Sequence, residues 1–324
     1  LPELFPGVIP IVGRHLAFIV FWWILGRFSF WFIDYFGIFF TGFINISLTA
    51  YISYLAAIPA FRDRNKRHTS LAYSMVSIVI IQAIFFLSES KILNIDSYKI
   101  LLLSMILFLV LILLALRRVS MESINELLNQ ENINEIFLAK SFRYNLAIFC
   151  LLLYGFVELF FPNNSTLAYI CFACGSATFA LLNDFVLKDN NILFKPFVLY
   201  IISTISITAI GFFFLGFNYL FELNITNHFR HFLTTGSFGM VFYVIMIIVS
   251  TIHTGRKIFT NWALTLGLIL IIIATFMRAF IPFYIEYSMT LYILSSIIWA
   301  IPFIIYMKIF FPFLLQVRAD GIKG

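Results

Sequence analysis

Charged residues are scarce in this sequence, and their scarcity excludes a soluble globular protein. Of 324 residues only 11% are charged, whereas 62% are hydrophobic and 19% are aromatic. An ordinary soluble domain carries roughly 25% charged residues, so this chain has too little polar surface to face water on all sides. We therefore expect an all-α integral membrane protein that forms a single polytopic domain over residues 1–324.

Cysteines are few, and several well-known catalytic motifs are missing. Cys150, Cys171 and Cys174 all fall inside apolar runs, which argues against an extracellular disulfide framework. Cys171 and Cys174 form a C-x-x-C within a predicted span, where small packing residues are a better interpretation than a redox pair or ligand set. The sequence has no Walker A motif, no H-E-x-x-H, no G-x-S-x-G and no C-x-x-C-H. Nucleotide-driven transport and hydrolysis therefore lose support.

Long apolar runs, in contrast, are abundant. A hydrocarbon core about 30 Å thick needs about 20 apolar residues per helix. Ten runs fit this requirement, at residues 9–26, 36–60, 69–88, 98–116, 142–161, 166–187, 196–216, 231–253, 261–281 and 289–313. We predict a bundle of about ten transmembrane helices. The longest connection, residues 119–140, alternates glutamates with apolar residues at a spacing typical of an amphipathic helix on the cytoplasmic membrane surface.

The net charge of +6 indicates topology rather than a nucleic-acid partner. Lysine and arginine are retained on the cytoplasmic side of membranes, and alternate connections hold 14 and five of the 21 basic residues. Both termini are therefore predicted to be cytoplasmic. The lipid bilayer is the expected partner, and we expect no nucleic acid to bind.

Two histidines at the ends of the eighth predicted span are the strongest candidates for chemistry. His231 begins this span at the outer face, and His253 ends it at the inner face. Their spacing of 22 residues is about six helical turns, so they share one face but stand about 33 Å apart. They cannot bind one metal ion together. The same stripe is predicted to carry Thr235, Gly239, Phe242, Met246 and Val249.

Further ligands must come from other segments. Imidazole suits iron, copper and zinc, and thioether sulfur suits reduced copper, which makes Met246 a candidate metal ligand. The predicted topology brings His15 and His68 to a depth comparable with that of His253, and His228 lies three residues before His231. The sequence thus offers two candidate sites, one at each membrane face. For each histidine, the alternative is an interfacial residue that only forms hydrogen bonds.

Two arginines are candidates for cofactor binding. Arg278 lies near the outer end of its span, where a cation beside a buried cofactor could hold a carboxylate such as a heme propionate. Snorkelling to the interface is the alternative for Arg278, as it is for Glu158. Arg256 follows His253 in the tetrapeptide His-Thr-Gly-Arg, which a helix C-cap at Gly255 also explains.

The region around these residues resembles the NnrS family of bacterial membrane proteins. Residues 231–239, H-F-L-T-T-G-S-F-G, resemble the family's H-A-L-T-x-G-x-x-G, and residues 253–256 match its G-H-T-G-R at the same interval. The tail supports the resemblance through Arg278, Pro282, Trp299, Pro312 and residues 318–324, which are similar to the family's R-x-D-G-x-x-G ending. Weaker similarities are residues 25–27, L-G-R, and residues 64–67, R-N-K-R.

The sequence also departs from the family pattern. Family members usually have twelve spans and begin with an H-x-H-E segment in the first pair, so we expect this chain to lack that N-terminal helix pair. The family's L-H-L-G-Y stretch aligns near Ile201 to Ile205, where this sequence has no histidine. Its G-R-V-I-P segment is reduced to Arg118 and Val119, and an arginine expected in the eighth span is Ile248.

The resemblance implies a multi-pass protein of the bacterial inner membrane that binds heme and copper and takes part in the nitric oxide response. It implies that His231 and His253 are ligands and that nitric oxide is the small-molecule partner. A reductase, a scavenger and a sensor all remain open. A transporter or permease and a cofactor-free scaffold that has kept the fold are the alternatives from other classes.

Overall fold

The described part of the chain is helical throughout. The computed structural model describes residues 11–62, 69–162, 164–187, 190–257, 259, 261–319 and 321. Within these ranges the elements are all helices, and nine helical segments are long and apolar enough to cross a membrane. Helix α1 (Gly13–Trp31) falls short of these nine because Arg14, His15 and Arg27 lower its hydropathy. The chain is a multi-pass membrane protein, and the predicted all-α class is confirmed.

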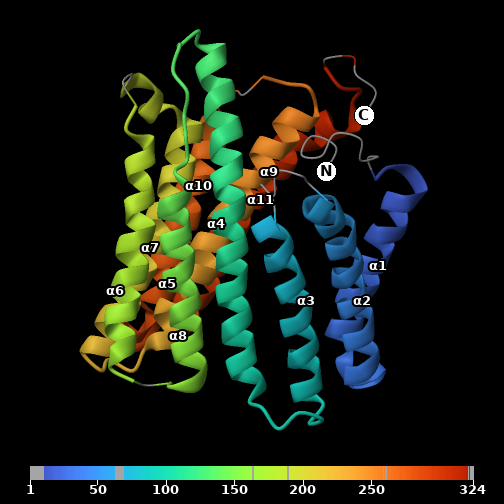
Figure 1. The fold of residues 1–324 in the computed structure, drawn as a ribbon, viewed down its shortest axis with the longest axis vertical. Helices are drawn as coiled ribbons and strands as arrows, with labels where there is room; N and C mark the ends of the chain where they lie inside the picture. Colours follow the sequence, from blue (N-terminus) through green and yellow to red (C-terminus); the bar gives the residue numbers. More distant parts are fainter. Residues whose placement is uncertain are drawn as a thin grey trace. The chain divides into compact units, whose positions relative to one another are not determined.

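By its internal contacts the chain divides into two compact units, residues 1–114 and 115–324. The single polytopic domain expected from the sequence stays a prediction. The first unit contains α1, α2 (Ile33–Arg62), α3 (Thr69–Glu89) and the first half of α4 (Ser97–Gln130). Figure 1 shows α1, α2 and α3 as successive antiparallel helices. Polar side chains join α1 to α2: Thr41 Oγ1 donates to the carbonyl of Ser29 at 3.1 Å, and Asn45 Nδ2 donates to that of Gly26 at 3.3 Å. Lipid tails are as apolar as the surfaces of these helices, so the hydrophobic effect does not drive the helices together. Hydrogen bonds between helices help to hold them together instead.

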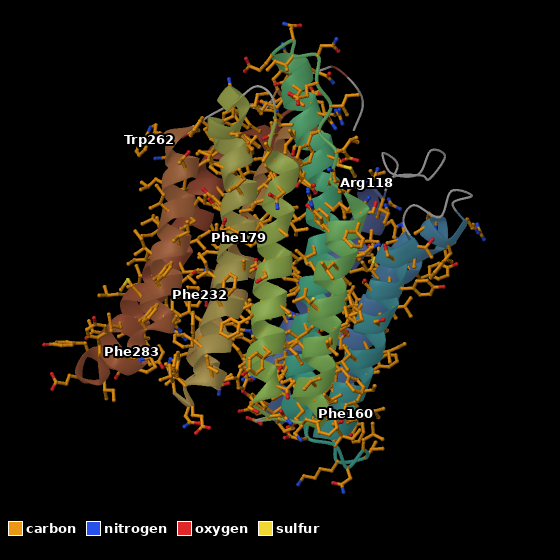
Figure 2. The ribbon with its side chains drawn as sticks, turned by 60° about the vertical axis from the view of Figure 1, so that its left-hand side comes forward. Arg118, Phe160, Phe179, Phe232, Trp262 and Phe283 are labelled. Carbon is orange, nitrogen blue, oxygen red and sulfur yellow. The ribbon has the colours of Figure 1, made fainter. Side chains whose placement is uncertain are left out.

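The second unit is built around a central helix, α7 (Pro196–Leu220), which contacts most of its neighbours. The other elements are the end of α4, α5 (Ser141–Phe160), α6 (Thr166–Phe179), η1 (Ala180–Phe185), η2 (Asn190–Phe194), α8 (Thr226–Phe229), η3 (Phe232–Phe238), α9 (Gly239–His253), α10 (Trp262–Ala279), η4 (Ile281–Phe283), η5 (Ile285–Tyr287) and α11 (Ser288–Leu315). Figure 2 shows Trp262 at one end of α10 and Phe283 just beyond the other.

Close packing around α7 depends on small and hydroxyl-bearing residues. A Cβ atom on Gly211 would lie only 2.7 Å from the Cβ of Phe232, so a larger residue would push η3 away from α7. Thr208 Oγ1 and Ser237 Oγ lie 2.6 Å apart and join the same two elements through a buried hydrogen bond. These contacts fix the position of η3 and therefore of the residues that precede it.

The segment 119–140 differs from the predicted separate surface helix. Helix α4 continues without a break through the membrane-spanning residues to Gln130, and residues 133–140 lie outside any helix. One face of this continuation is covered by protein, since Ile124 and Leu128 are 1% and 0% exposed. The segment after the helix is bonded back to it, because Asn125 Oδ1 accepts a hydrogen bond from the backbone N–H of Phe137 at 2.8 Å.

An ion pair with a buried carboxylate ties α5 to η1, the short helix that follows α6. The Asp184 side chain is fully buried and pairs with Arg143, and it also accepts from the backbone N–H of Lys140 at 3.0 Å. Removing one partner of a buried pair leaves an uncompensated charge, which is more costly than losing an exposed pair.

We expect Asp184→Ala to lower the free energy of unfolding by about 1–3 kcal/mol, because the backbone N–H of Lys140 would lose its acceptor and the half-buried Arg143 its counterion. The matched control is Glu122→Ala, which removes the exposed partner of Arg118 and costs about 0–1 kcal/mol. Denaturant or thermal unfolding in detergent measures both. Equal stability of the two variants would contradict a structural role for the buried pair.

Candidate functional site

A π-helical turn shapes the motif that begins at His231. The segment η3, Phe232–Phe238, is wound as a π-helix, directly after His231 and before α9. A π-helix bonds each carbonyl to the fifth residue onward, which strains the regular ladder and often marks functional positions. Here the indole Nε1 of Trp299 on α11 donates to the carbonyl of Thr235 at 3.1 Å. A side chain from another helix thus bonds a backbone group of the irregular turn.

Trp299 approaches the turn closely because Gly239 has no side chain. A Cβ at Gly239 would lie 2.7 Å from Trp299 Nε1, so any larger residue would displace the indole. The family-like spacing of Gly239 after His231 therefore has a steric explanation: it makes room for the tryptophan.

A cavity of about 340 Å³ opens beside this turn. Three elements of the second unit, η3, α10 and α11, contribute to its wall. The lining residues are His231, Thr234, Thr235, Arg278, Ser295, Ser296 and Trp299. In Figure 2 Phe232, the first residue of the turn, lies nearer to Phe283 than to Trp262, which places the turn toward the end of α10 that carries Arg278.

Arg278 gives this cavity a positive charge. Its guanidinium lies 4.5 Å from the ring centroid of Tyr292 and 3.5 Å from Ser296 Oγ. No carboxylate is among the lining residues, and the ion pairs of the described ranges do not include Arg278. The site therefore combines an imidazole with a guanidinium that can accept an anionic partner.

A buried polar network holds the short helix α8 that leads into His231. Glu158 on α5 pairs with Arg230 at 2.5 Å, and their side chains are 6% and 11% exposed. Tyr154 and Tyr219 both donate to Glu158 Oε1, at 2.6 and 3.2 Å. Sequence reasoning left Glu158 as an isolated carboxylate and counted Arg230 as a loop cation. The sequence did contain a signal for this pair, because the acidic Glu158 and the basic Arg230 lie at the same predicted membrane face.

His228 is a second histidine at this end of the molecule. The ring centroids of His228 and His231 lie 6.3 Å apart with their planes tilted by 71°. His228 Nδ1 is buried and has no hydrogen-bond partner in the part of the chain that the structure describes. His231 Nδ1 lies 3.4 Å from Thr235 Oγ1, a long contact. No group of three His, Cys, Asp or Glu residues suitable for a metal occurs among the described residues.

The π-helical turn interrupts the predicted stripe from His231 to His253. A π-helical turn accommodates about one extra residue, which rotates everything after it by about 100° relative to a regular α-helix. Gly239 is buried, but Phe242 and Val249 further along the stripe are 54% and 40% exposed. The residues of the predicted stripe therefore have different surroundings.

The other predicted site residues do not line the cavity beside the π-helical turn. His253 is exposed at the end of α9, and Arg256 lies 4.2 Å over the ring of Phe313 and donates to Gln316 Oε1 at 3.0 Å. Met246 is half-buried within α9. His15 belongs to the first unit, where its Nε2 lies 2.7 Å from Tyr51 Oη. His68, residues 64–67 and Asp320 lie outside the described residues.

The geometry can now be set beside known proteins. A family model described as NnrS protein matches residues 2–318, essentially the whole chain. The chain belongs to the NnrS family. No curated protein and no solved structure matches it.

The NnrS-like motifs acquire physical meaning in this structure. The first motif is the π-helical turn, and Arg278 and Trp299 of the C-terminal pattern meet that turn around one cavity. The second motif ends α9: Gly255 has a φ of 67°, and Thr254 accepts from the backbone N–H of Ala319 at 3.0 Å, which joins the tail to the turn. Where the family pattern has polar residues, Ile201 and Ile248 are buried apolar residues.

We expect Trp299→Phe to destabilise the protein by about 1–3 kcal/mol, because the Thr235 carbonyl would lose its donor inside the membrane. Trp262→Phe is the matched control, since Trp262 is 77% exposed and its loss should leave stability unchanged. Thermal unfolding of both purified variants measures the difference. An unaltered melting temperature for Trp299→Phe would show that the indole bond does not support the turn.

Proposed function

We propose that this NnrS-family chain is a metalloprotein of the bacterial inner membrane that acts in the response to nitric oxide. We further propose that the cavity beside the π-helical turn, which the predicted topology places at the outer face, is its cofactor site. The observation that carries the proposal is the meeting of His231, Arg278 and Trp299, which are far apart in sequence, around one irregular turn. Family membership supports the proposal independently.

The residues present fit a heme in their chemistry. His231 would ligate the iron through its imidazole, and Arg278, which has no carboxylate in its surroundings, would hold a propionate. Heme iron with an open coordination position binds nitric oxide. The chain's own contributions are to hold the imidazole at the start of the π-helical turn, to neutralise an anionic substituent, and to fix the turn with Trp299.

Copper is the second candidate cofactor, and His228 favours it. Two imidazoles on one metal ion, with each nitrogen about 2.0 Å from the ion, place their ring centroids roughly 6 Å apart or less. The observed 6.3 Å for His228 and His231 is close to this limit, and the buried His228 Nδ1 has no other partner in the described ranges. His228 and His231 would then be the ligands of a copper ion at the same end of the molecule.

His231→Ala should abolish the heme Soret band, or lower the copper content, of the purified full-length protein to below one tenth of wild type. The control is His253→Ala, at the opposite end of α9, which should keep its cofactor. Absorption spectra of the oxidised and reduced forms, before and after nitric oxide is added, together with metal analysis, provide the readout.

The pattern of losses separates the possibilities. Loss of cofactor in His253→Ala alone would place the centre at the inner face and refute the outer-face site. A wild-type protein without iron or copper and with a featureless spectrum would refute the metalloprotein proposal. A solute-uptake assay in vesicles would then test the permease alternative, and an inactive, colourless but stable protein would fit the scaffold.

A further inference from the structure

A second cavity, of about 350 Å³, lies within the first unit at the depth of the membrane-spanning segments. Helices α1, α2, α3 and α4 all contribute to its wall. The lining residues are Arg27, Phe30, Asn45, Thr49, Ile78, Ile81, Gln82, Phe85, Phe86, Leu101, Ser104 and Phe108. Because hydrocarbon surrounds these helices, any ligand that reaches the cavity laterally must be soluble in lipid.

The charged group in this wall has no counterion. Arg27 donates to Asn45 Oδ1 at 2.5 Å, and the ion pairs of the described ranges do not include it. Asn45 is already engaged, since its Nδ2 donates to the carbonyls of Gly26 and Thr41. A guanidinium has five N–H donors, so Arg27 retains donors for an oxygen acceptor on a ligand.

A neighbouring acceptor is also unsatisfied. Gln82 Oε1 is buried and has no hydrogen-bond partner among the residues that the structure describes. The two hydroxyls in the wall do not supply one, because Thr49 donates to the carbonyl of Asn45 at 2.9 Å and Ser104 donates to that of Leu101 at 2.7 Å. A ligand that donates at Gln82 and accepts at Arg27 would therefore satisfy both groups.

The remainder of the wall is aromatic. Phe86 packs edge-on against both Phe30 and Phe85, with ring centroids 6.4 and 5.5 Å apart. Aromatic side chains pack favourably against a flat ring in stacked or edge-on geometries. An aromatic ligand head therefore suits this wall better than an aliphatic chain.

We propose that this cavity binds the ring of a membrane quinol. A hydroquinone has two ring hydroxyls, each of which donates and accepts, so one donates to Gln82 Oε1 while an oxygen accepts from Arg27. The carboxylate of a fatty acid and the phosphodiester of a lipid only accept. A phospholipid would need a separate headgroup donor for Gln82 Oε1, and it would bring no ring to the aromatic wall. The proposal concerns the first unit alone and does not depend on the metal centre.

The test is equilibrium binding of decylubiquinol to the purified full-length protein, followed by titration calorimetry. We expect saturable binding by the wild type. Arg27→Gln and Gln82→Leu should each weaken it about tenfold, the effect expected for one hydrogen bond to a charged or buried group. Arg14→Gln is the matched control, because Arg14 is on the same helix but does not line the cavity. A photoreactive azidoquinone, reduced to its quinol before illumination, should label α1 to α4.

Size-exclusion profiles first establish that each variant is folded, and Arg27→Lys replaces Arg27→Gln if that variant aggregates. Absence of saturable binding by the wild type would overturn the proposal, as would wild-type affinity in both folded cavity variants. Copurification of an anionic phospholipid that decylubiquinol does not displace and that Arg27→Gln releases would also overturn it, because the cavity would then be a headgroup site.

Discussion

The need to satisfy backbone hydrogen bonds in a medium without water governs the functional end of this protein. A π-helical turn in hydrocarbon exposes irregular backbone that a membrane cannot solvate. The structure meets this need with the indole of Trp299, which bonds the Thr235 carbonyl from another helix. The cavity, the placement of His231 and the proximity of Arg278 all depend on that turn keeping its shape.

The surrounding contacts brace the same turn from different sides. On α7, Gly211 leaves room for the close approach of the turn, and Thr208 holds the turn there by a hydrogen bond. The ion pair between Glu158 and Arg230 anchors the short helix just before the turn. Because these groups belong to helices α5, α7 and α8, the candidate site rests on the packing of most of the second unit. Residues distant from any ligand are therefore expected to influence how the site is arranged.

Much of the fold follows from apolar run lengths, but the candidate site follows only in part. Hydropathy located the spans because each must be long enough to cross the hydrocarbon core. The histidine at the start of the eighth span and Arg278 were recognisable as costly groups at membrane depth, but their meeting at one cavity depends on tertiary packing. The extra residue of the π-helical turn leaves no periodic signature, so the regular helix assumed from the sequence does not describe how the residues after the turn lie relative to His231. Likewise Arg27, taken as a marker of topology, lines a cavity because Asn45 and Gln82 approach it from other helices.

The burial of all three cysteines has a practical consequence. Cys150, Cys171 and Cys174 are 8%, 0% and 0% exposed, and they lie within spans rather than in connections. Impermeant maleimides should therefore react little with the native thiols, and a cysteine introduced into a single connection would provide the main labelled position. The wild-type chain is thus a ready background for mapping, connection by connection, which side of the membrane each part of the protein faces.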